Sequence, residues 1–235
     1  DPNLQNIPIR TEMGRAIRRA FVADGPGHVV LKADYSQIEL RILAHVSGDR
    51  NLCEAYREGR DIHARTAREL FGVSEGEVTR AMRDQAKVVN FGIVYGMSAH
   101  GLAQRLGIGR GEAARYIERY FSTYPGVRAW IDRLLAEARE RGWVETLLGR
   151  RRTLPDLTAR NSLLRSNAER MAVNSPIQGT CADIIKLAMI RLHRELPTAL
   201  PEARMVCQVH DELVFSVARE RADEASAYVC RVMSE

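Results

Sequence analysis

Cysteine is scarce in this sequence, and its placement forms no recognisable metal site. The four cysteines, Cys53, Cys181, Cys207 and Cys230, include no C-x-x-C pair, and none stands beside a histidine at zinc-site spacing. The spacing therefore argues against the common zinc modules. It favours free thiols, which are typical of a reducing cytoplasm.

Long apolar runs are also missing. No stretch approaches the ~20 apolar residues that a membrane-spanning helix needs. The first residues, DPNLQNIPIR, lack the basic-then-apolar layout of a secretory signal. We therefore expect a soluble intracellular protein with no membrane partner. Internal repeats and low-complexity segments are absent from the sequence as well.

The charge balance is only mildly basic. Lys and Arg total 35 against 30 Asp and Glu, which gives a formal net charge of +5. This excess is compatible with a polyanionic partner but does not require one, because many basic proteins bind nothing acidic. Apolar residues make up 45 % of the chain, which is enough to bury a sizeable core.

Turn signals and apolar periodicity predict a mixed architecture in the first part of the chain. We expect an irregular start up to Met13 and then two short strands on either side of Gly25-Pro26-Gly27. Helices should follow over residues 37–45 and through most of 49–124. Two caps are expected among them: a capping box from Ser74 to Glu77, and Ser98 before a further helix.

The second part of the chain completes an α+β layout. We expect helices over residues 112–120, 127–141, 163–173, 181–196 and from 221, with hairpins over 143–157 and 203–217. The last hairpin carries His-Asp-Glu at its tip. The sheet is therefore built from segments far apart in the sequence, with a helical block inserted between them.

Two distant aspartates are candidates for one metal site. Asp34 follows the mostly apolar segment VVLKA, and Asp211 stands where the last hairpin turns. Carboxylates at adjacent strand ends form a hard, oxygen-rich site suited to Mg²⁺, and two such ions can hold the reacting oxygens of a phosphoryl transfer. From the residues alone, a turn former, a helix N-cap or a solvated hairpin tip remains an open alternative.

One predicted helix carries evenly spaced cations and aromatics. Arg83, Lys87, Phe91 and Tyr95 follow one another at steps of four, so they trace a slanting stripe along one side of the helix. Two phosphate-binding cations followed by two aromatics suit a nucleoside triphosphate. An amphipathic helix with a solvated cationic end and an aromatic core end explains the same spacing, and the pattern does not decide between them.

Three motifs resemble those of family A DNA polymerases, of the bacterial DNA polymerase I type. DYSQIELR (34–41) resembles the first palm motif, RDQAKVVNFGIVYG (83–96) the fingers motif and QVHDE (208–212) the last palm motif. Their order and spacing match, and the resemblance covers the whole chain. It implies template-directed addition of deoxynucleotides to a primer 3′-OH by two-metal-ion phosphoryl transfer, with pyrophosphate release. The implied partners are primer–template DNA and dNTP substrates, in the cytoplasm at the bacterial nucleoid.

The resemblance also implies catalytic roles. Asp34 and Asp211 would bind two Mg²⁺ ions, with help from the Tyr35 carbonyl and from Glu212 as a supporting carboxylate. Lys87 would hold the triphosphate and protonate the leaving pyrophosphate.

The same resemblance implies a nucleotide site and a DNA-binding surface. Glu39 would close off the space around the sugar 2′ position, and Phe91, which has no hydroxyl, implies poor acceptance of dideoxynucleotides. The nucleotide-binding residues would be Gln37, Glu39, His63, Arg83, Lys87, Phe91 and Tyr95. The DNA-binding residues would be Asn6, Arg10, Arg170, Asn174, Gln178 and His210.

The implied fold is an antiparallel palm sheet with a large inserted helical fingers subdomain. Residues 1–48 and 151–235 would form the palm, and residues 49–150 the fingers. Because the family's polymerase unit is larger, the thumb and the last palm strands would come from a longer parent or chimeric chain. Two alternatives stay open: an inactive fragment that binds primer–template or nucleotide, and a related single-subunit RNA polymerase, against which Glu39 and Phe91 argue.

Overall fold

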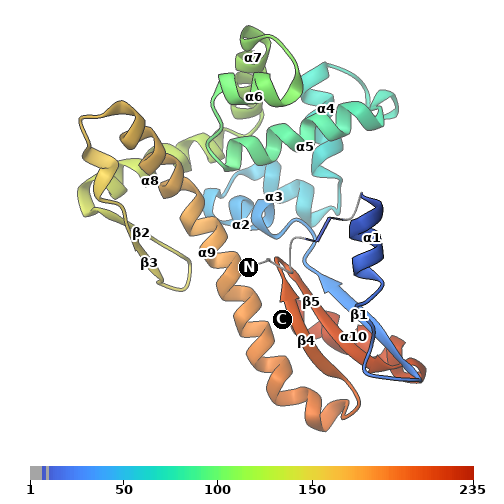
Figure 1. Ribbon diagram of the computed structural model, residues 1–235. Coiled ribbons are helices and arrows are strands. Elements are labelled where there is room, and N and C mark those ends of the chain that lie inside the picture. Colours follow the sequence, from blue (N-terminus) through green and yellow to red (C-terminus); the bar gives the residue numbers. More distant parts are fainter. Residues whose placement is uncertain (1–6, 9–10) are drawn as a thin grey trace. The chain divides into compact units, whose positions relative to one another are not determined.

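The computed structural model describes residues 7–8 and 11–235 (Figure 1). The strands are β1 (His28–Asp34), β2 (Trp143–Glu145), β3 (Arg151–Thr153), β4 (Arg204–Val209) and β5 (Glu212–Ala218). The helices are α1 (Glu12–Arg18), α2 (Ile38–Ser47), α3 (Arg50–Arg57), α4 (Ile62–Phe71), α5 (Arg80–Val94), α6 (Ala99–Leu106), α7 (Arg110–Thr123), α8 (Pro125–Arg141), α9 (Ser162–Ala199) and α10 (Ala222–Ser234). This mixture of helices and small antiparallel sheets confirms the predicted α+β class.

The chain divides into two compact units. The first comprises Asp1–Ser36 and Ala182–Glu235, and the second comprises Gln37–Cys181. Helix α9 runs from one unit into the other. The palm and fingers boundaries stay a prediction.

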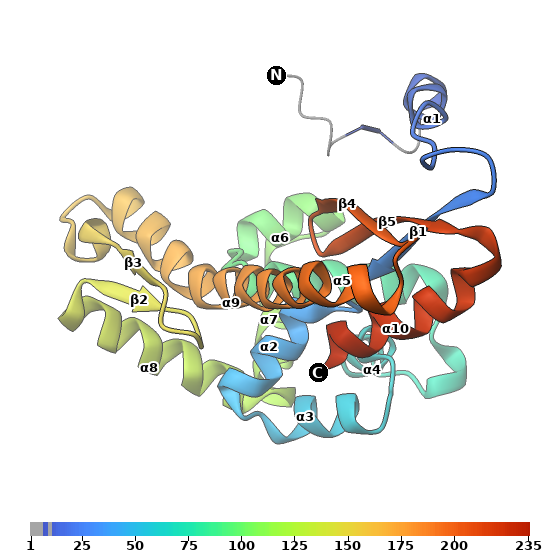
Figure 2. The ribbon, with the colours of Figure 1, turned by 90° about the horizontal axis from the view of Figure 1, so that it is seen from below.

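The first unit contains a three-stranded antiparallel sheet in the order β1-β5-β4. Its central strand carries the buried side chains Leu213, Phe215 and Val217, which alternate along one face as a half-buried strand requires. Helix α10 packs against β1 and β5 (Figure 2) and buries Val229 and Val232. The sheet and this helix therefore form one core, which holds the ends of β1 and β5 in register.

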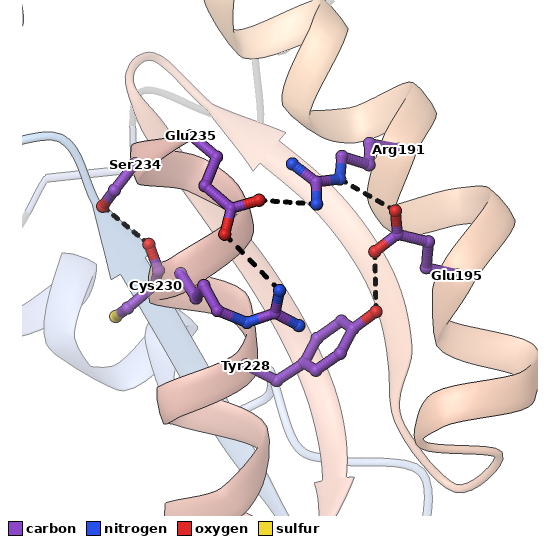
Figure 3. A network of polar contacts seen from close by, with 7 residues as sticks. Arg191, Glu195, Tyr228, Cys230, Ser234 and Glu235 are labelled. Carbon is purple, nitrogen blue, oxygen red and sulfur yellow. Dashed lines mark hydrogen bonds and ion pairs between the residues drawn. The ribbon is translucent and has the colours of Figure 1, made fainter.

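A polar network joins α10 to the last part of α9 (Figure 3). Arg191 binds Glu195 of its own helix at 2.8 Å and Glu235 at 2.6 Å. The Tyr228 hydroxyl donates to the other oxygen of Glu195 at 2.7 Å. Glu195 thus accepts from both helices, which fixes their register in this unit.

The second unit is a bundle of short helices that end on clear sequence signals. The Asp61, Thr79 and Ser98 side chains cap α4, α5 and α6 by accepting from backbone N–H groups. Helices α4 and α5 pack together and both contact α7. None of the helices in the described part of the chain has the length and apolar character that a bilayer span requires.

The β2–β3 hairpin is tied to α9 within the second unit. The Leu147 N–H donates to the Thr180 hydroxyl at 3.0 Å. A Cβ at Gly179 would lie 2.5 Å from the Thr146 methyl carbon. The absence of a side chain at Gly179 therefore lets the hairpin approach the helix closely.

The strand predicted before the Gly-Pro-Gly turn is wrong, because the segment contains helix α1 instead. The Thr11 hydroxyl accepts from the Gly14 N–H and so caps the helix. The Arg18 guanidinium holds its other end by donating to the Ile7 carbonyl. These two contacts stabilise the helix locally, and among the described strands none pairs with the other edge of β1.

Two other predictions of helix limits need correction. The two helices predicted over 163–173 and 181–196 are one helix, α9, which continues through Pro176. Proline removes one helical hydrogen bond, and the buried Val173 and Ile177 hold both sides of it in place. The Ser74–Glu77 capping box exists but caps a short 3-10 turn, Glu75–Glu77.

Candidate active site

An acidic cluster forms where β1 ends and β5 begins. Asp34 lies directly opposite Glu212 in the antiparallel register. The Tyr35 N–H donates to the Asp211 carbonyl at 3.2 Å, so pairing continues for one step beyond the strands. Antiparallel pairing therefore brings Asp34 next to Asp211 and Glu212, which the sequence predicted for the two aspartates. His210 forms the turn beside them with a φ of 55°.

The acidic cluster contains more negative than positive charge. Burial, followed by the nearby Asp211 and Glu212 carboxylates, raises the pKa of Asp34 above its ordinary value. Lys32 opposes the shift but is engaged elsewhere, because its ammonium binds Glu212 at 2.8 Å. A cation between Asp34 and Asp211 would remove the remaining repulsion.

The donor set suits Mg²⁺ that is shared with a substrate. Among residues 7–8 and 11–235, no three or more His, Cys, Asp or Glu side chains form a cage that could hold a metal ion. Mg²⁺ in phosphoryl-transfer sites characteristically uses only one or two carboxylates and takes further ligands from substrate phosphates and water. Two aspartates and a backbone carbonyl fit that pattern, with Glu212 as support.

The predicted stripe lies along α5, and Arg83, Phe91 and Tyr95 are partly buried. The rings of Phe91 and Tyr95 stack with centroids 6.4 Å apart. Lys87 is exposed. Arg83 is held by Asp61, whose carboxylate lies 2.6 Å from the guanidinium Nε. Two cationic side chains and two aromatic rings therefore lie in a row along one helix, and each is at least partly accessible.

Glu39 and Tyr95 form a hydrogen-bonded pair between α2 and α5. The Tyr95 hydroxyl donates to Glu39 Oε2 at 2.6 Å. Burial first, and then this bond, raise the pKa of Tyr95 to about 12. Gln178 of α9 lies within hydrogen-bonding reach of the same hydroxyl. Gln37, just before α2, accepts from the Tyr56 hydroxyl at 3.1 Å.

His63 is buried next to the stripe. Its ring lies 5.9 Å from that of Phe91, and its Nδ1 lies 2.9 Å from the amide nitrogen of Asn90. Burial lowers the pKa of His63 to about 4; the Asp61 carboxylate opposes this shift, and the positive charges of Arg83 and Lys87 add to it. His63 is therefore a neutral imidazole at physiological pH.

The predicted DNA-binding residues of α9 lie on the side of that helix that faces the end of α5. A Cβ at Gly96, just after α5, would lie 2.9 Å from Arg170 Cγ, so the end of α5 contacts α9. Asn174 has a buried Oδ1 with no hydrogen-bond partner in the described part of the chain. Such an atom is costly to leave unpaired, and a bound ligand could supply its donor. Asn6 and Arg10 lie outside the described residues.

Three residues of the site carry no role in the sequence prediction. Lys32 precedes Asp34 by two positions, and strand alternation puts both on one face. Asp61 has the signal of a helix N-cap before IHAR. Asn90 has no local signal, because its importance depends on a contact with α4.

Comparison with known proteins gives a consistent result. The model of the family "DNA polymerase family A" matches residues 1–235. The thermostable DNA polymerase I of Thermus filiformis is 57 % identical over 99 % of this chain, which covers 28 % of that protein. DNA polymerase I of Geobacillus stearothermophilus is 55 % identical over 100 % of this chain, which covers 27 % of that protein.

A solved structure is similar as well. The chain superposes on the POL domain of Pol1 from M. smegmatis, in complex with DNA primer-template and dNTP, with a TM-score of 0.92 and 47 % identity. The match covers 99 % of this chain and 41 % of that one. The chain thus spans just over a quarter of the length of the curated relatives it matches.

Proposed function

The chain belongs to DNA polymerase family A, and on that premise we propose that it forms the catalytic and nucleotide-binding part of a DNA-directed DNA polymerase. The reaction is the addition of a deoxynucleotide to a primer 3′-OH with release of pyrophosphate, in the bacterial cytoplasm at the nucleoid. The observation that carries this proposal is the pairing of β1 with β5, which puts Asp34 opposite Glu212 and beside Asp211.

Two Mg²⁺ ions would be held by Asp34, Asp211 and the Tyr35 carbonyl, with Glu212 close by. When bound, they supply Lewis-acid stabilisation of the attacking and leaving oxygens. The pKa of Asp34 is raised first by burial and then by the Asp211 and Glu212 carboxylates, which supports this role because a bound cation would stabilise the ionised carboxylate. Glu212 is already neutralised by Lys32, which leaves the two aspartates as the stronger metal ligands.

The triphosphate would meet the cationic end of α5. Arg83 and Lys87 bind its phosphates through charge-assisted hydrogen bonds, and Lys87 protonates the leaving pyrophosphate. To bind phosphate, Arg83 either breaks its ion pair with Asp61 or keeps Nε bonded to Asp61 and donates its remaining N–H groups to the phosphate. His63 adds a neutral donor beside them.

The sugar and base would meet the aromatic end of the same helix. Phe91 packs on the sugar and base, and Tyr95 lies at the templating position. Glu39, fixed by the Tyr95 hydroxyl and neighboured by Gln37, occupies the space that a ribose 2′-hydroxyl needs. This arrangement favours deoxynucleotides over ribonucleotides. Arg170, Asn174, Gln178 and His210 contact the primer–template.

Primer extension by the full-length protein tests the proposal. Asp34→Asn and Asp211→Asn each remove one charged ligand with almost no change in shape, and each should reduce extension by at least about a thousandfold. Asp223→Asn is the matched control, since Asp223 is an exposed acid of α10 in the same unit. Near-normal extension by either active-site variant, with Asp223→Asn also normal, would refute the proposal.

A further inference from the structure

The buried polar residues behind His63 form a chain of hydrogen bonds that the proposed chemistry has not yet used. His63, Thr66 and Asn90 are 2 %, 1 % and 1 % exposed, and Tyr124 is fully buried. They come from α4, α5 and the end of α7, within one unit. Polar groups buried to this degree are retained only with well-made hydrogen bonds.

The distances and the chemistry of the groups show which one donates in each of these hydrogen bonds. The Thr66 hydroxyl has a single proton, and it lies 3.0 Å from Asn90 Oδ1 but 3.3 Å from the Tyr124 hydroxyl. It therefore donates to Asn90, while Tyr124 donates to it. With its oxygen occupied in this way, Asn90 turns its amide nitrogen to His63 Nδ1, at 2.9 Å. An amide nitrogen can only donate, so Nδ1 is the acceptor.

We propose that Asn90, oriented by Thr66 and Tyr124, is a positioning residue that fixes His63 as the Nε2–H tautomer, so that the imidazole donates to the nucleotide triphosphate. A neutral imidazole has one donor and one acceptor nitrogen, and the bond made by one nitrogen decides the role of the other. Phosphate oxygens only accept, so the Nδ1–H tautomer would present a lone pair to them.

The open side of the ring agrees with this assignment. Within the described residues no partner is found for Nε2, and Nε2 is not among the sealed, unpaired polar atoms. The neighbouring charges are the Asp61 carboxylate and the cations of Arg83 and Lys87, and these two cations are the groups that would bind phosphate. The inference rests on the proposed nucleotide site for its ligand, but the tautomer itself is a property of the nucleotide-free chain.

The first measurement is therefore made without nucleotide. ¹⁵N NMR of the chain labelled at histidine nitrogens distinguishes protonated from unprotonated ring nitrogens, and His63→Gln assigns the signals. We expect a proton on Nε2 and none on Nδ1. Asn90→Asp replaces the donor by a carboxylate of the same shape and should move the proton to Nδ1. A wild-type proton on Nδ1 would overturn the inference, even with primer extension intact.

The second measurement is dNTP affinity. Losing one hydrogen bond to a charged group should raise the dissociation constant about tenfold in Asn90→Asp. Asn51→Asp is the matched control: it adds the same charge and also loses a donated bond, to the Thr123 carbonyl, without contact to His63. The control should bind nearly as wild type.

Two more variants separate the tautomer from added charge and from misfolding. Thr66→Val adds no charge, keeps the side-chain shape and frees the Asn90 amide to turn, so it should also weaken dNTP binding. In a His63→Gln background the Gln amide provides a donor that needs no tautomer, so Asn90→Asp should lose most of its effect there. An undiminished effect of Asn90→Asp in that background would show that Asn90 does not act through His63.

Discussion

At the scale of single residues, the site depends on groups whose ionisation the fold has changed. His63 is kept neutral by burial, whereas the pKa of Asp34 is raised first by burial and then by the Asp211 and Glu212 carboxylates. In the proposed function these two pKa shifts would serve opposite purposes. A neutral histidine donates to phosphate without adding charge, and a repelled carboxylate gains the most from a divalent cation.

The burial of His63 predicts a pH dependence of stability. Its pKa falls from 6.5 to about 4 on folding, so the unfolded chain binds the proton more tightly. The contribution of the neutral His63 to the free energy of unfolding is then complete above pH ~6.5. It is lost as the pH falls towards about 4, and this loss is at most about 3 kcal/mol. Urea unfolding at pH 7 and pH 5 measures the loss.

The His63→Gln variant should lose much less stability between these two pH values. His45→Gln removes an exposed histidine of α2 and serves as the control, which should keep the wild-type slope. Equal slopes for all three proteins would contradict the assignment of a buried neutral imidazole at position 63.

The Tyr95–Glu39 pair predicts an effect on sugar selection. Tyr95→Phe removes the hydroxyl that donates to Glu39 at 2.6 Å and leaves the ring in place. Glu39 is then free to move away from the sugar, and ribonucleotide incorporation relative to deoxynucleotide should rise about fivefold. Single-nucleotide incorporation kinetics with the full-length protein measure the ratio.

Tyr116→Phe is the matched control for this prediction. The Tyr116 hydroxyl makes a comparable bond to a glutamate, Glu112, at 3.0 Å, but it does so within α7. Discrimination should be unchanged in this variant. A ratio that rises equally in both variants would show that the effect is not specific to the Glu39 pair.

At the scale of elements, the contact between α9 and the β2–β3 hairpin depends on Gly179. An alanine there places its Cβ 2.5 Å from the Thr146 methyl carbon. Since the hairpin must shift to make room, we expect a loss of about 1–3 kcal/mol. Gly111→Ala provides the contrast, because this glycine of α7 has open space around it, and it should gain up to about 1 kcal/mol.

Denaturant unfolding of both glycine variants tests this pair of predictions. The opposite signs are the informative part, because both changes put the same residue into a helix. A Gly179→Ala variant as stable as Gly111→Ala would show that the hairpin adapts at no cost.

Elements with local signals could be predicted from the sequence, and those that depend on distant contacts could not. Ser98 caps α6 as predicted, and the last hairpin has its acidic turn as expected. Helix α9 was split in the prediction because proline is a local breaker, whereas its continuity depends on packing around Val173 and Ile177. Helix α1 was missed because AIRRAFVA fits a strand about as well as a helix.

The candidate site shows the same division. The motifs identified Asp34, Asp211 and the α5 stripe, since each lies within a run of characteristic residues. The supporting contacts of Lys32, Asp61 and Asn90 connect segments 22 to 180 residues apart, and no local pattern encodes such pairs. Candidate reactive residues are therefore easier to predict from a single sequence than the residues that position them.

At the scale of the whole molecule, the polypeptide forms two units, and each contains some of the residues of the proposed site. The unit of Asp1–Ser36 and Ala182–Glu235 holds the acidic cluster, and the unit of Gln37–Cys181 holds the cations, aromatics and His63. The proposed phosphoryl transfer would require residues from both units, because that chemistry uses both metal ions and phosphate-binding cations. The central claim of the proposed function is thus that the acidic cluster of the first unit binds divalent ions.

Mn²⁺ binding followed by electron paramagnetic resonance measures that capacity directly. With dNTP and primer–template present, the full-length protein should bind two ions at this cluster. Asp34→Asn and Asp211→Asn should each weaken binding at least about tenfold, while the Asp223→Asn control binds as wild type. Wild-type Mn²⁺ affinity in both active-site variants would contradict the account.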